Sequence, residues 1–151
     1  IKYISTYAGT YYRMGTVTEV DASGTALGSP VNYGNTHDII NCSTVGFKST
    51  APRTVVCPGV GNEKENVGSV TLIMDVDKNV VVTGVEGKAA ISDASGSYKT
   101  EGEYDYVANV GTRAPQFDLE YTYVKDGKYY HVAEKLVLRQ DPLYDLRVET
   151  W

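Results

Sequence analysis

The sequence is short of the residues that build most catalytic centres. It contains two His, two Cys, two Met, two Phe and one Trp in 151 residues. It has no G-x-S-x-G segment, and His37, although it stands beside Asp38, has no nucleophile motif near it. Both facts argue against hydrolase chemistry of the Ser-His-Asp type. We therefore expect a protein that is not an enzyme, with no catalytic residue and no cofactor.

Metal-binding motifs are equally scarce. One segment resembles the oxygen ligands of a calcium loop, with Asp75, Asp77, Asn79 and Glu86 at the corresponding positions. Val80 stands where such a loop needs glycine, and the flanking segments alternate as strands do. His131 and Glu134 are three residues apart on an expected strand, so they face opposite sides and cannot share an ion. We predict no metal site.

Positive charge and long apolar runs are also missing. Fourteen Lys and Arg oppose nineteen Asp and Glu, which gives a net charge of −5. Nucleic-acid binding requires clustered Lys and Arg, and the sequence has no basic run, so we expect no nucleic-acid partner. No apolar segment approaches the ~20 residues of a membrane-spanning helix. We expect a protein that does not span a membrane.

The two cysteines leave two interpretations open. Cys42 and Cys57 flank a turn expected near Ser49 and Thr50. A turn centred between these two residues places the cysteines opposite each other, and a disulfide there would contribute about 3 kcal/mol. A register shift of one residue removes the bridge and leaves two separate buried thiols. A bridge, and a chain that begins at Ile1 instead of Met, would both indicate export.

Tyrosine, by contrast, is abundant, with thirteen copies. Tyr suits strands because its ring packs while its hydroxyl reaches water or a polar partner. A Tyr-rich surface also suits ligand binding, because large amphipathic contacts cost little side-chain entropy. Strand propensity and ligand binding explain the tyrosines about equally well.

The clearest strand pair covers residues 117–139. Its apolar positions alternate with polar ones and are Phe117, Leu119, Tyr121, Tyr123, Tyr130, Val132, Leu136 and Leu138. This alternation predicts a hairpin with one apolar face. The segment KDGK at 125–128 supplies the turn, because Asp-Gly is favoured where the backbone needs positive φ. Glu134 is the exception, a carboxylate on the apolar face.

Residues 10–20 form the first clear strand. The face that carries Tyr12, Met14 and Val20 is the more apolar, so we expect it to point inward, with Arg13 on the other face. Gly15 in the middle of the strand predicts a bend or a close backbone approach.

Residues 98–107 also alternate. Tyr98, Tyr104 and Tyr106 share one face, after an expected turn at residues 93–96. A last strand carries Tyr144 and Leu146 near the end of the chain.

About eight to ten short strands joined by hairpins imply an all-β antiparallel meander. We expect residues 1–151 to form a single domain. Closure into a barrel removes exposed edges and leaves room for one small ligand. A two-sheet sandwich is the alternative.

Glu134 is the strongest candidate for a functional residue. A buried carboxylate must find a cation, find hydrogen bonds or take up a proton. In the structural interpretation it pairs with Arg13 or with Tyr hydroxyls, or a bulge turns it outward. In the functional interpretation Glu134 or Arg13 fixes the polar group of a ligand in a cavity lined by tyrosines. The predicted ligand-binding residues are Arg13, Tyr98, Tyr104, Tyr106, Tyr121, Tyr123 and Glu134.

Two stretches carry a resemblance to known proteins: residues 7–17 (YAGTYYRMGTV) and the ending YYHVAEKLVLRQDPLYDLRVE. With these, the sequence resembles a group of exported or surface proteins of Bacteroidetes that have no assigned function. Their barrel is similar to that of lipocalins, and they are provisionally described as lipid binders. The resemblance implies a lipocalin-like barrel and export to the periplasm or the outer-membrane surface.

Two ligand classes follow for a non-enzymatic binding module. The first is a small hydrophobic or amphipathic, lipid-like ligand at the mouth of the barrel. The second is a glycan, because members of the group often accompany polysaccharide-uptake systems; exposed Tyr33 and Tyr129 would then serve as stacking platforms. An open interior favours the first class, and a filled core with exposed aromatic side chains favours the second. Two carboxyl groups facing each other in a cleft would favour an enzyme instead.

Overall fold

The computed structural model describes residues 2–4, 7–107, 109–139 and 148–150. The barrel strands are β2 (Gly9–Val20), β4 (Ser43–Ala51), β5 (Thr54–Pro58), β6 (Ser69–Met74), β7 (Asn79–Gly84), β8 (Ile91–Lys99), β11 (Gln116–Lys125) and β12 (Lys128–Arg139). The elements outside the barrel are β1 (Lys2–Ile4), β3 (Val31–Tyr33), the 3₁₀ turn η1 (Ile39–Asn41), β9 (Asp105–Tyr106), β10 (Asn109–Arg113) and β13 (Val148–Thr150).

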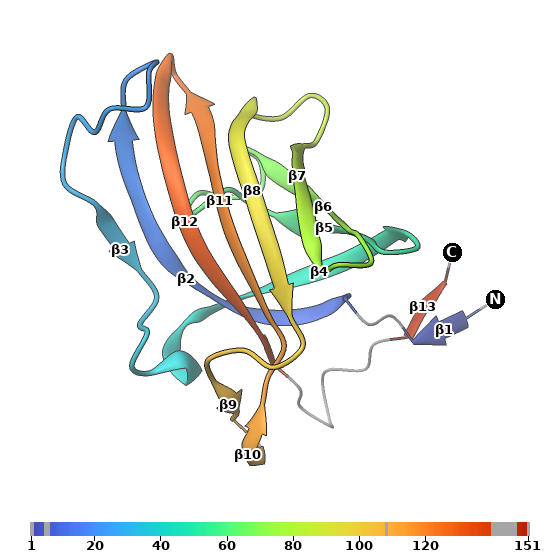
Figure 1. Ribbon diagram of the computed structural model, residues 1–151. Helices are drawn as coiled ribbons and strands as arrows, with labels where there is room; N and C mark the ends of the chain where they lie inside the picture. The colour runs from blue at the N-terminus through green and yellow to red at the C-terminus, as the bar shows by residue number, and fades with distance from the viewer. Residues whose placement is uncertain (1, 5–6, 108, 140–147, 151) are drawn as a thin grey trace.

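Eight antiparallel strands close into a barrel (Figure 1). Each barrel strand pairs with the barrel strand that follows it in the chain. The last of them, β12, pairs with the first, β2, from Tyr129↔Val20 to Arg139↔Thr10. β3 adds a short strand to β2 outside the closed ring, and β9 and β10 form a separate pair. The predicted all-β meander barrel is confirmed, and the alternative of a two-sheet sandwich is wrong.

The hairpin of β11 and β12 has the predicted turn and faces. Lys125 pairs with Lys128, and the two residues between them, Asp126 and Gly127, have φ values of 52° and 74°. Two positive φ angles in a two-residue loop match the right-handed twist of the strands. The predicted apolar side chains of β11 are at most 2% exposed, and Glu134 lies on the same inner face of the hairpin at 3%.

The expected orientation of β2 is wrong. Its inner face carries Tyr11, Arg13 and Val17, while Tyr12 and Met14 lie in a second apolar cluster outside the barrel. That outer cluster is covered by η1 and by residues 102–114, which contribute Ile39, Tyr104 and Ala114 among others. Both faces of β2 are therefore buried, so apolar character does not distinguish inside from outside.

The expected turn at residues 93–96 is also wrong. These residues lie within β8, where Asp93 has φ 47° and the register with β11 shifts between Glu120 and Thr122. A bulge of this kind explains why a Ser-, Gly- and Asp-rich segment continues as a strand. The expected strand at residues 98–107 also differs, because β8 ends at Lys99. Tyr98 lies on β8 and inside the barrel, whereas Tyr104 lies beyond the end of that strand.

Cys42 and Cys57 are separate, buried free thiols. The turn between β4 and β5 comes later than expected, with Ala51 opposite Thr54 and Arg53 at φ 57°. This register carries Cys57 into the barrel core and leaves Cys42 in the outer cluster. The disulfide is therefore not formed.

The barrel core is aromatic at one end. Tyr11 stacks on Phe47 with 4.3 Å between ring centroids, and Phe117 lies 5.6 Å from Tyr11 and 4.8 Å from Tyr98. These side chains are buried. This half of the barrel is packed and not hollow.

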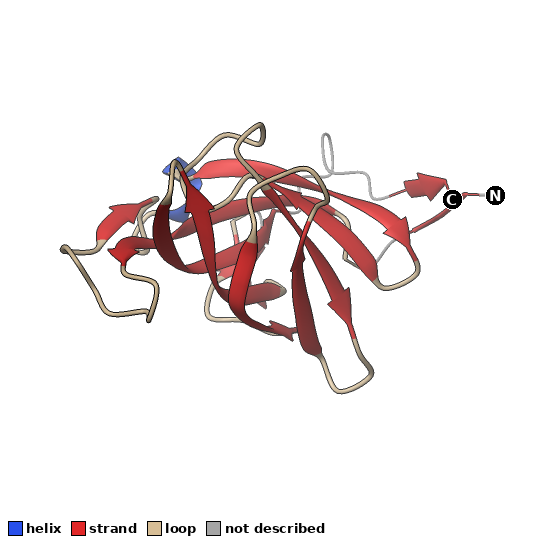
Figure 2. Cartoon of the chain, turned by 90° about the horizontal axis from the view of Figure 1, so that it is seen from above, coloured by secondary structure: helices blue, strands red, loops and turns tan. Residues whose placement is uncertain are grey.

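The terminal strands β1 and β13 pair with each other and project from the barrel beside both chain ends (Figure 2). The expected strand positions Tyr144 and Leu146 lie outside the described residues. Within the described ranges, no helix is long and apolar enough to cross a membrane.

Candidate functional site

Glu134 forms an ion pair with Arg13 in the middle of the barrel. Arg13 Nε donates to Glu134 Oε1 at 2.7 Å, and Nη2 donates to Oε2 at 3.0 Å. The side chains are 9% and 0% exposed. Burial acts to lower the pKa of Arg13, but Cys57, Glu134 and Tyr121 together raise it well above its ordinary value. Glu134 therefore pairs with Arg13, as its structural interpretation expected.

The same pair holds the loop between β5 and β6, residues 59–68, inside one end of the barrel. Arg13 Nη1 donates to the carbonyl oxygen of Pro58 at 2.6 Å, and Nη2 donates to that of Gly59 at 3.2 Å. Val60 of this loop is fully buried. We call residues 59–68 the plug loop, because they fill the end of the barrel that carries the β11–β12 turn.

Tyr121 links the ion pair to the plug loop. Its hydroxyl donates to Glu134 Oε2 at 2.9 Å and accepts a hydrogen bond from the Gly61 amide at 2.8 Å. Burial first, and then the charge of Glu134, raise the pKa of Tyr121 well above its ordinary value. Gly61 has φ 56°, and a Cβ there would lie 2.9 Å from Val17 Cγ2, so only glycine fits.

Tyr33 differs from Arg13, Glu134 and Tyr121, which all form hydrogen bonds. Its hydroxyl is buried but has no hydrogen-bond partner among the described residues. Burial first, and then the charge of Glu134, raise its pKa. The carboxylate of Glu134 lies close to this hydroxyl, and its proximity adds to the rise in pKa. A buried hydroxyl without a partner costs about 1–3 kcal/mol.

Of the tyrosines predicted to line one cavity, the structure brings three into the barrel. Tyr98, Tyr121 and Tyr123 are buried in the core, where Tyr123 stacks on Tyr130 at 5.2 Å. Tyr104 packs against the outer cluster, and Tyr106 lies between the two clusters. The five rings therefore do not share one cavity.

Two grooves adjoin at the plug loop, and both are lined by Asn62 and Glu63. The first, of about 410 Å³, is lined among others by Arg13, Tyr33, Ser43, Thr44, Gly59, Lys64 and Glu65. We call it the Arg13 groove. The second, of about 330 Å³, is lined by Val17, Val31, Tyr123 and Tyr130 together with polar residues that include Glu19 and Ser29. We call it the Tyr123 groove. Both grooves mix apolar and polar side chains at the end of the barrel.

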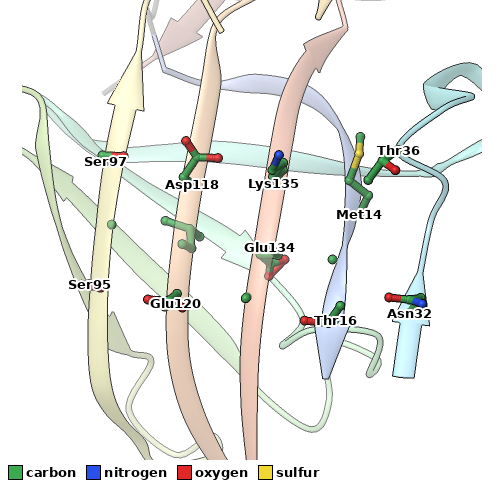
Figure 3. Close-up of a pocket in the computed structure, with 14 residues that line it drawn as sticks. Met14, Thr16, Asn32, Thr36, Ser95, Ser97, Asp118, Glu120, Glu134 and Lys135 are labelled. Carbon is green, nitrogen blue, oxygen red and sulfur yellow. The ribbon is translucent and has the colours of Figure 1, made fainter. Parts of the chain in front are cut away.

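A third, larger groove lies on the outer face of the barrel wall (Figure 3). It has a volume of about 620 Å³ and crosses β8, β11, β12 and β2. Figure 3 shows two rows of side chains that follow the strand register, one with Ser97, Asp118, Lys135, Met14 and Thr36, the other with Ser95, Glu120, Thr16 and Asn32. We call it the outer groove. Its lining combines hydroxyl and carboxylate side chains with apolar surface, to which Met14, Leu119 and Ala133 belong.

Three acidic residues line the outer groove, of which Glu134 is buried and paired with Arg13, and the other two do not face each other. Asp118 and Glu120 are two residues apart on β11, and Asp118 is already bound by Lys99 at 3.0 Å. Glu120 lies 3.8 Å from His131 Nε2. Carboxylates that cleave a glycosidic bond flank it from two sides. These two line the same side of the groove.

Other candidate residues have structural roles. Asp75 Oδ1 accepts hydrogen bonds from the amides of Asp77 and Asn79 and so closes the β6–β7 turn. His131 Nδ1 lies 2.9 Å from the Thr122 hydroxyl on the outer face. Among the residues that the structure describes, no three His, Cys, Asp or Glu side chains cluster as a metal site would require.

Nothing in the sequence marked the plug loop as part of the site. Its segment Gly59-Val60-Gly61 indicates a tight turn, but nothing local shows that it folds into the barrel. Tyr33 was expected to be an exposed platform, yet its hydroxyl is buried. Tyr33 lies in the three-residue strand β3, which is too short to show a periodic pattern. Only the tertiary structure therefore shows that its hydroxyl is buried.

The comparisons with known proteins support the fold. No family model matches the sequence, and no curated protein matches it. A crystal structure of a protein of unknown function from Bacteroides ovatus is similar, with a TM-score of 0.69 and 20% identity. The match covers 97% of this chain and 47% of that one, so this chain spans about half the length of that protein. A likeness at this identity shows that the two proteins share the barrel fold.

Proposed function

We propose that this chain is a non-enzymatic, lipocalin-like binding module that holds a small amphipathic ligand at the mouth of its barrel. One observation carries the proposal: two grooves adjoin at the plug loop, one with Arg13 in its lining and the other with Val17, Val31 and Tyr123. Binding pockets are typically apolar with a few placed polar groups. The tail would lie against Val17, Val31 and Tyr123, and the polar group would face Arg13 and Tyr33.

The packed interior favours the mouth over the centre of the barrel. Arg13, Glu134 and Tyr121 bind one another and the plug loop, so they are not available to a ligand at the centre. The aromatic cluster fills the opposite half. A ligand at the mouth needs no rearrangement of either group.

Binding is tested with three medium-chain amphiphiles, octanoate, octanol and octanamide, followed by native mass spectrometry and by amide chemical shifts in titrations. We expect at least one to bind and to shift residues of the plug loop. Val31→Glu should weaken binding at least about tenfold, because it places a charge in the Tyr123 groove where the alkyl part of the ligand would lie.

Val81→Glu is the matched control. Val81 is 54% exposed on β7 and Val31 is 57% exposed on β3, and Val81 lines none of the three grooves. Equal loss of binding in both variants would contradict the proposal, as would failure of the wild-type protein to bind any of the three compounds.

A surface carbohydrate-binding role is the second candidate, and the outer groove favours it. Rows of Ser, Thr, Asn and carboxylate side chains offer many hydrogen-bonding groups to an extended hydroxylated chain. A glycan array tests this candidate, with Glu120→Ala to remove a groove carboxylate and Glu101→Ala as an exposed control outside it. Binding of no polysaccharide, or equal loss in both variants, would eliminate the outer groove as a glycan site.

We also propose that the protein is exported to the periplasm or the outer-membrane surface, as the resemblance to Bacteroidetes surface proteins implies. Fractionation of cells of the source organism, with detection by antibody, would test this location. Recovery of the protein in the cytoplasmic fraction alone would contradict it.

A further inference from the structure

A carboxylate and an aromatic ring lie side by side in the Tyr123 groove. Glu19 pairs with Tyr130 across β2 and β12, so the two side chains point to the same side of the barrel wall. Tyr130 packs against the barrel core, which makes this side the inner one. Both side chains are partly buried, and both line the groove together with Val17 and Val31.

The stacking of Tyr130 leaves one face of its ring on the side of Glu19. Tyr123, Tyr130 and Glu19 stand opposite one another in a row across β11, β12 and β2. Tyr123 stacks on Tyr130 from the β11 side, with 5.2 Å between the ring centroids and 25° between the ring planes. The other face of the Tyr130 ring is therefore turned toward β2, where Glu19 stands.

Glu19 has no counter-ion in the structure. Among the described residues, no group donates a hydrogen bond to its carboxylate or forms an ion pair with it. Glu63, the other acidic residue of the groove, is already neutralised, because Lys125 Nζ lies 3.1 Å from both of its oxygens. No Lys, Arg or His is among the described residues that line the groove. The groove therefore carries one uncompensated negative charge.

This lining suits an organic cation better than a metal ion. A calcium or magnesium ion needs several oxygen ligands around one point, and the described residues contain no cluster of three acidic, His or Cys side chains. An alkylammonium group is attracted by a single carboxylate and by the face of an aromatic ring, while its carbon atoms contact apolar side chains. Glu19 and Tyr130 offer the first two contacts, and Val17 and Val31 offer the third.

We infer that the Tyr123 groove binds an organic cation, an ammonium group attached to an alkyl chain, between the Glu19 carboxylate and the ring of Tyr130. This inference rests on the proposed binding at the mouth and deepens it. It adds a charged nitrogen to the amphiphile, at the end of the groove where Glu19 lies. The polar contact with Arg13 in the adjoining groove stays as proposed.

The experiment compares octylamine, octanol and octanoate, which share one alkyl length and carry a positive, a neutral and a negative polar group at neutral pH. Titrations followed by amide chemical shifts give the three dissociation constants. We expect octylamine to bind about three- to thirtyfold more tightly than octanol, the combined effect of one partly exposed ion pair and one cation–π contact. Octanoate should bind more weakly than octanol, because Glu19 repels it.

Glu19→Gln removes the charge and keeps the length of the side chain. It should weaken octylamine about two- to fivefold and leave the affinity for octanol unchanged. Glu86→Gln is the matched control, because it removes the same charge from an exposed glutamate that lines none of the grooves. Non-specific attraction of a cation to the acidic protein falls equally in both variants.

Equal affinities of the wild-type protein for octylamine and octanol overturn the inference but leave binding at the mouth standing. Equal affinities of Glu19→Gln and Glu86→Gln for octylamine also overturn it, since the attraction is then not local to the groove. If none of the amphiphiles binds, the proposed function fails and the inference fails with it.

Discussion

At the scale of single residues, the polar cluster around Glu134 shows how a buried charge can position a loop. A buried ion pair is often no more stabilising than apolar side chains of similar volume. Here the ion pair also positions the plug loop, because the remaining N–H groups of Arg13 donate to the carbonyl oxygens of Pro58 and Gly59. An apolar pair would fill the space but would not hold the plug loop.

Glu134→Gln should therefore destabilise the protein strongly. It leaves the Arg13 charge buried without a counter-ion, which costs about 3–5 kcal/mol of unfolding free energy. Urea unfolding followed by circular dichroism measures the change. The double variant Arg13→Met/Glu134→Leu should recover only part of that loss, since no charge then remains buried but the carbonyl oxygens of Pro58 and Gly59 lose their donor. An unchanged urea midpoint in Glu134→Gln would show that the side chain is solvated.

Two tyrosine hydroxyls in the same cluster should respond in opposite ways. Tyr121→Phe removes a hydroxyl that bonds to both Glu134 and Gly61, so we expect a loss of about 1–3 kcal/mol. Tyr33→Phe removes a buried hydroxyl that has no partner among the described residues, so the unligated protein should be unchanged or slightly more stable. Parallel urea titrations compare them. Equal losses would mean that Tyr33 is hydrogen-bonded in solution.

At the scale of elements, β2 depends on a close approach to β12. A Cβ on Gly15 would clash with the carbonyl oxygen of Ala133 and would lie 2.7 Å from the Cα of Glu134. Both atoms belong to the backbone, so no rotamer change relieves the clash. The glycine lets β2 bend, so that one half pairs with β4 and the other with β3.

Gly15→Ala should cost more than about 2 kcal/mol, because the strands must separate to admit a methyl group. Gly46→Ala on β4 is the control: a Cβ there meets nothing within 4 Å, and Gly46 is not among the residues with positive φ. We expect that control to be neutral or slightly stabilising, because alanine reduces the entropy of the unfolded chain. Differential unfolding of the two variants in urea checks the prediction. Similar stabilities would indicate that β2 and β12 can separate freely.

At the scale of the whole molecule, the closed barrel protects what lies inside it. Cys57 is fully buried, and burial, opposed by Arg13, raises the pKa of its thiol to about 12. Only the thiolate reacts with alkylating reagents, so the raised pKa leaves very little reactive thiolate near neutral pH, and the closed barrel also keeps the reagent from the sulfur.

Cys57 should therefore react with iodoacetamide only when the barrel opens. In a Cys42→Ser background, labelling across a urea series, detected by mass spectrometry, should follow the same transition as circular dichroism if residues 1–151 unfold as one domain. Labelling that precedes the transition would show that the barrel opens locally or that the chain contains separate units. The reverse variant, Cys57→Ser, reports on Cys42 in the outer cluster.

The sequence allowed the barrel to be predicted because its strongest signals are local. Alternation from Phe117 to Leu138 sets the inner face of a hairpin, and Asp126-Gly127 sets its turn. The same logic failed in β2, because Tyr12 and Met14 are buried on the outside by segments distant in the sequence. It also failed in β8, where Asp93 continues a bulged strand instead of turning the chain.

The alternation, the turns and the isolated carboxylate at position 134 follow from the sequence, because they depend on neighbours within a few residues. The partner of Glu134, the position of the plug loop and the burial of the Tyr33 hydroxyl without a partner among the described residues follow from the tertiary structure alone. Arg13 and Glu134 are far apart along the chain, and they meet because β2 closes the ring against β12. That closure depends on the register of every strand in between, and no local pattern encodes it.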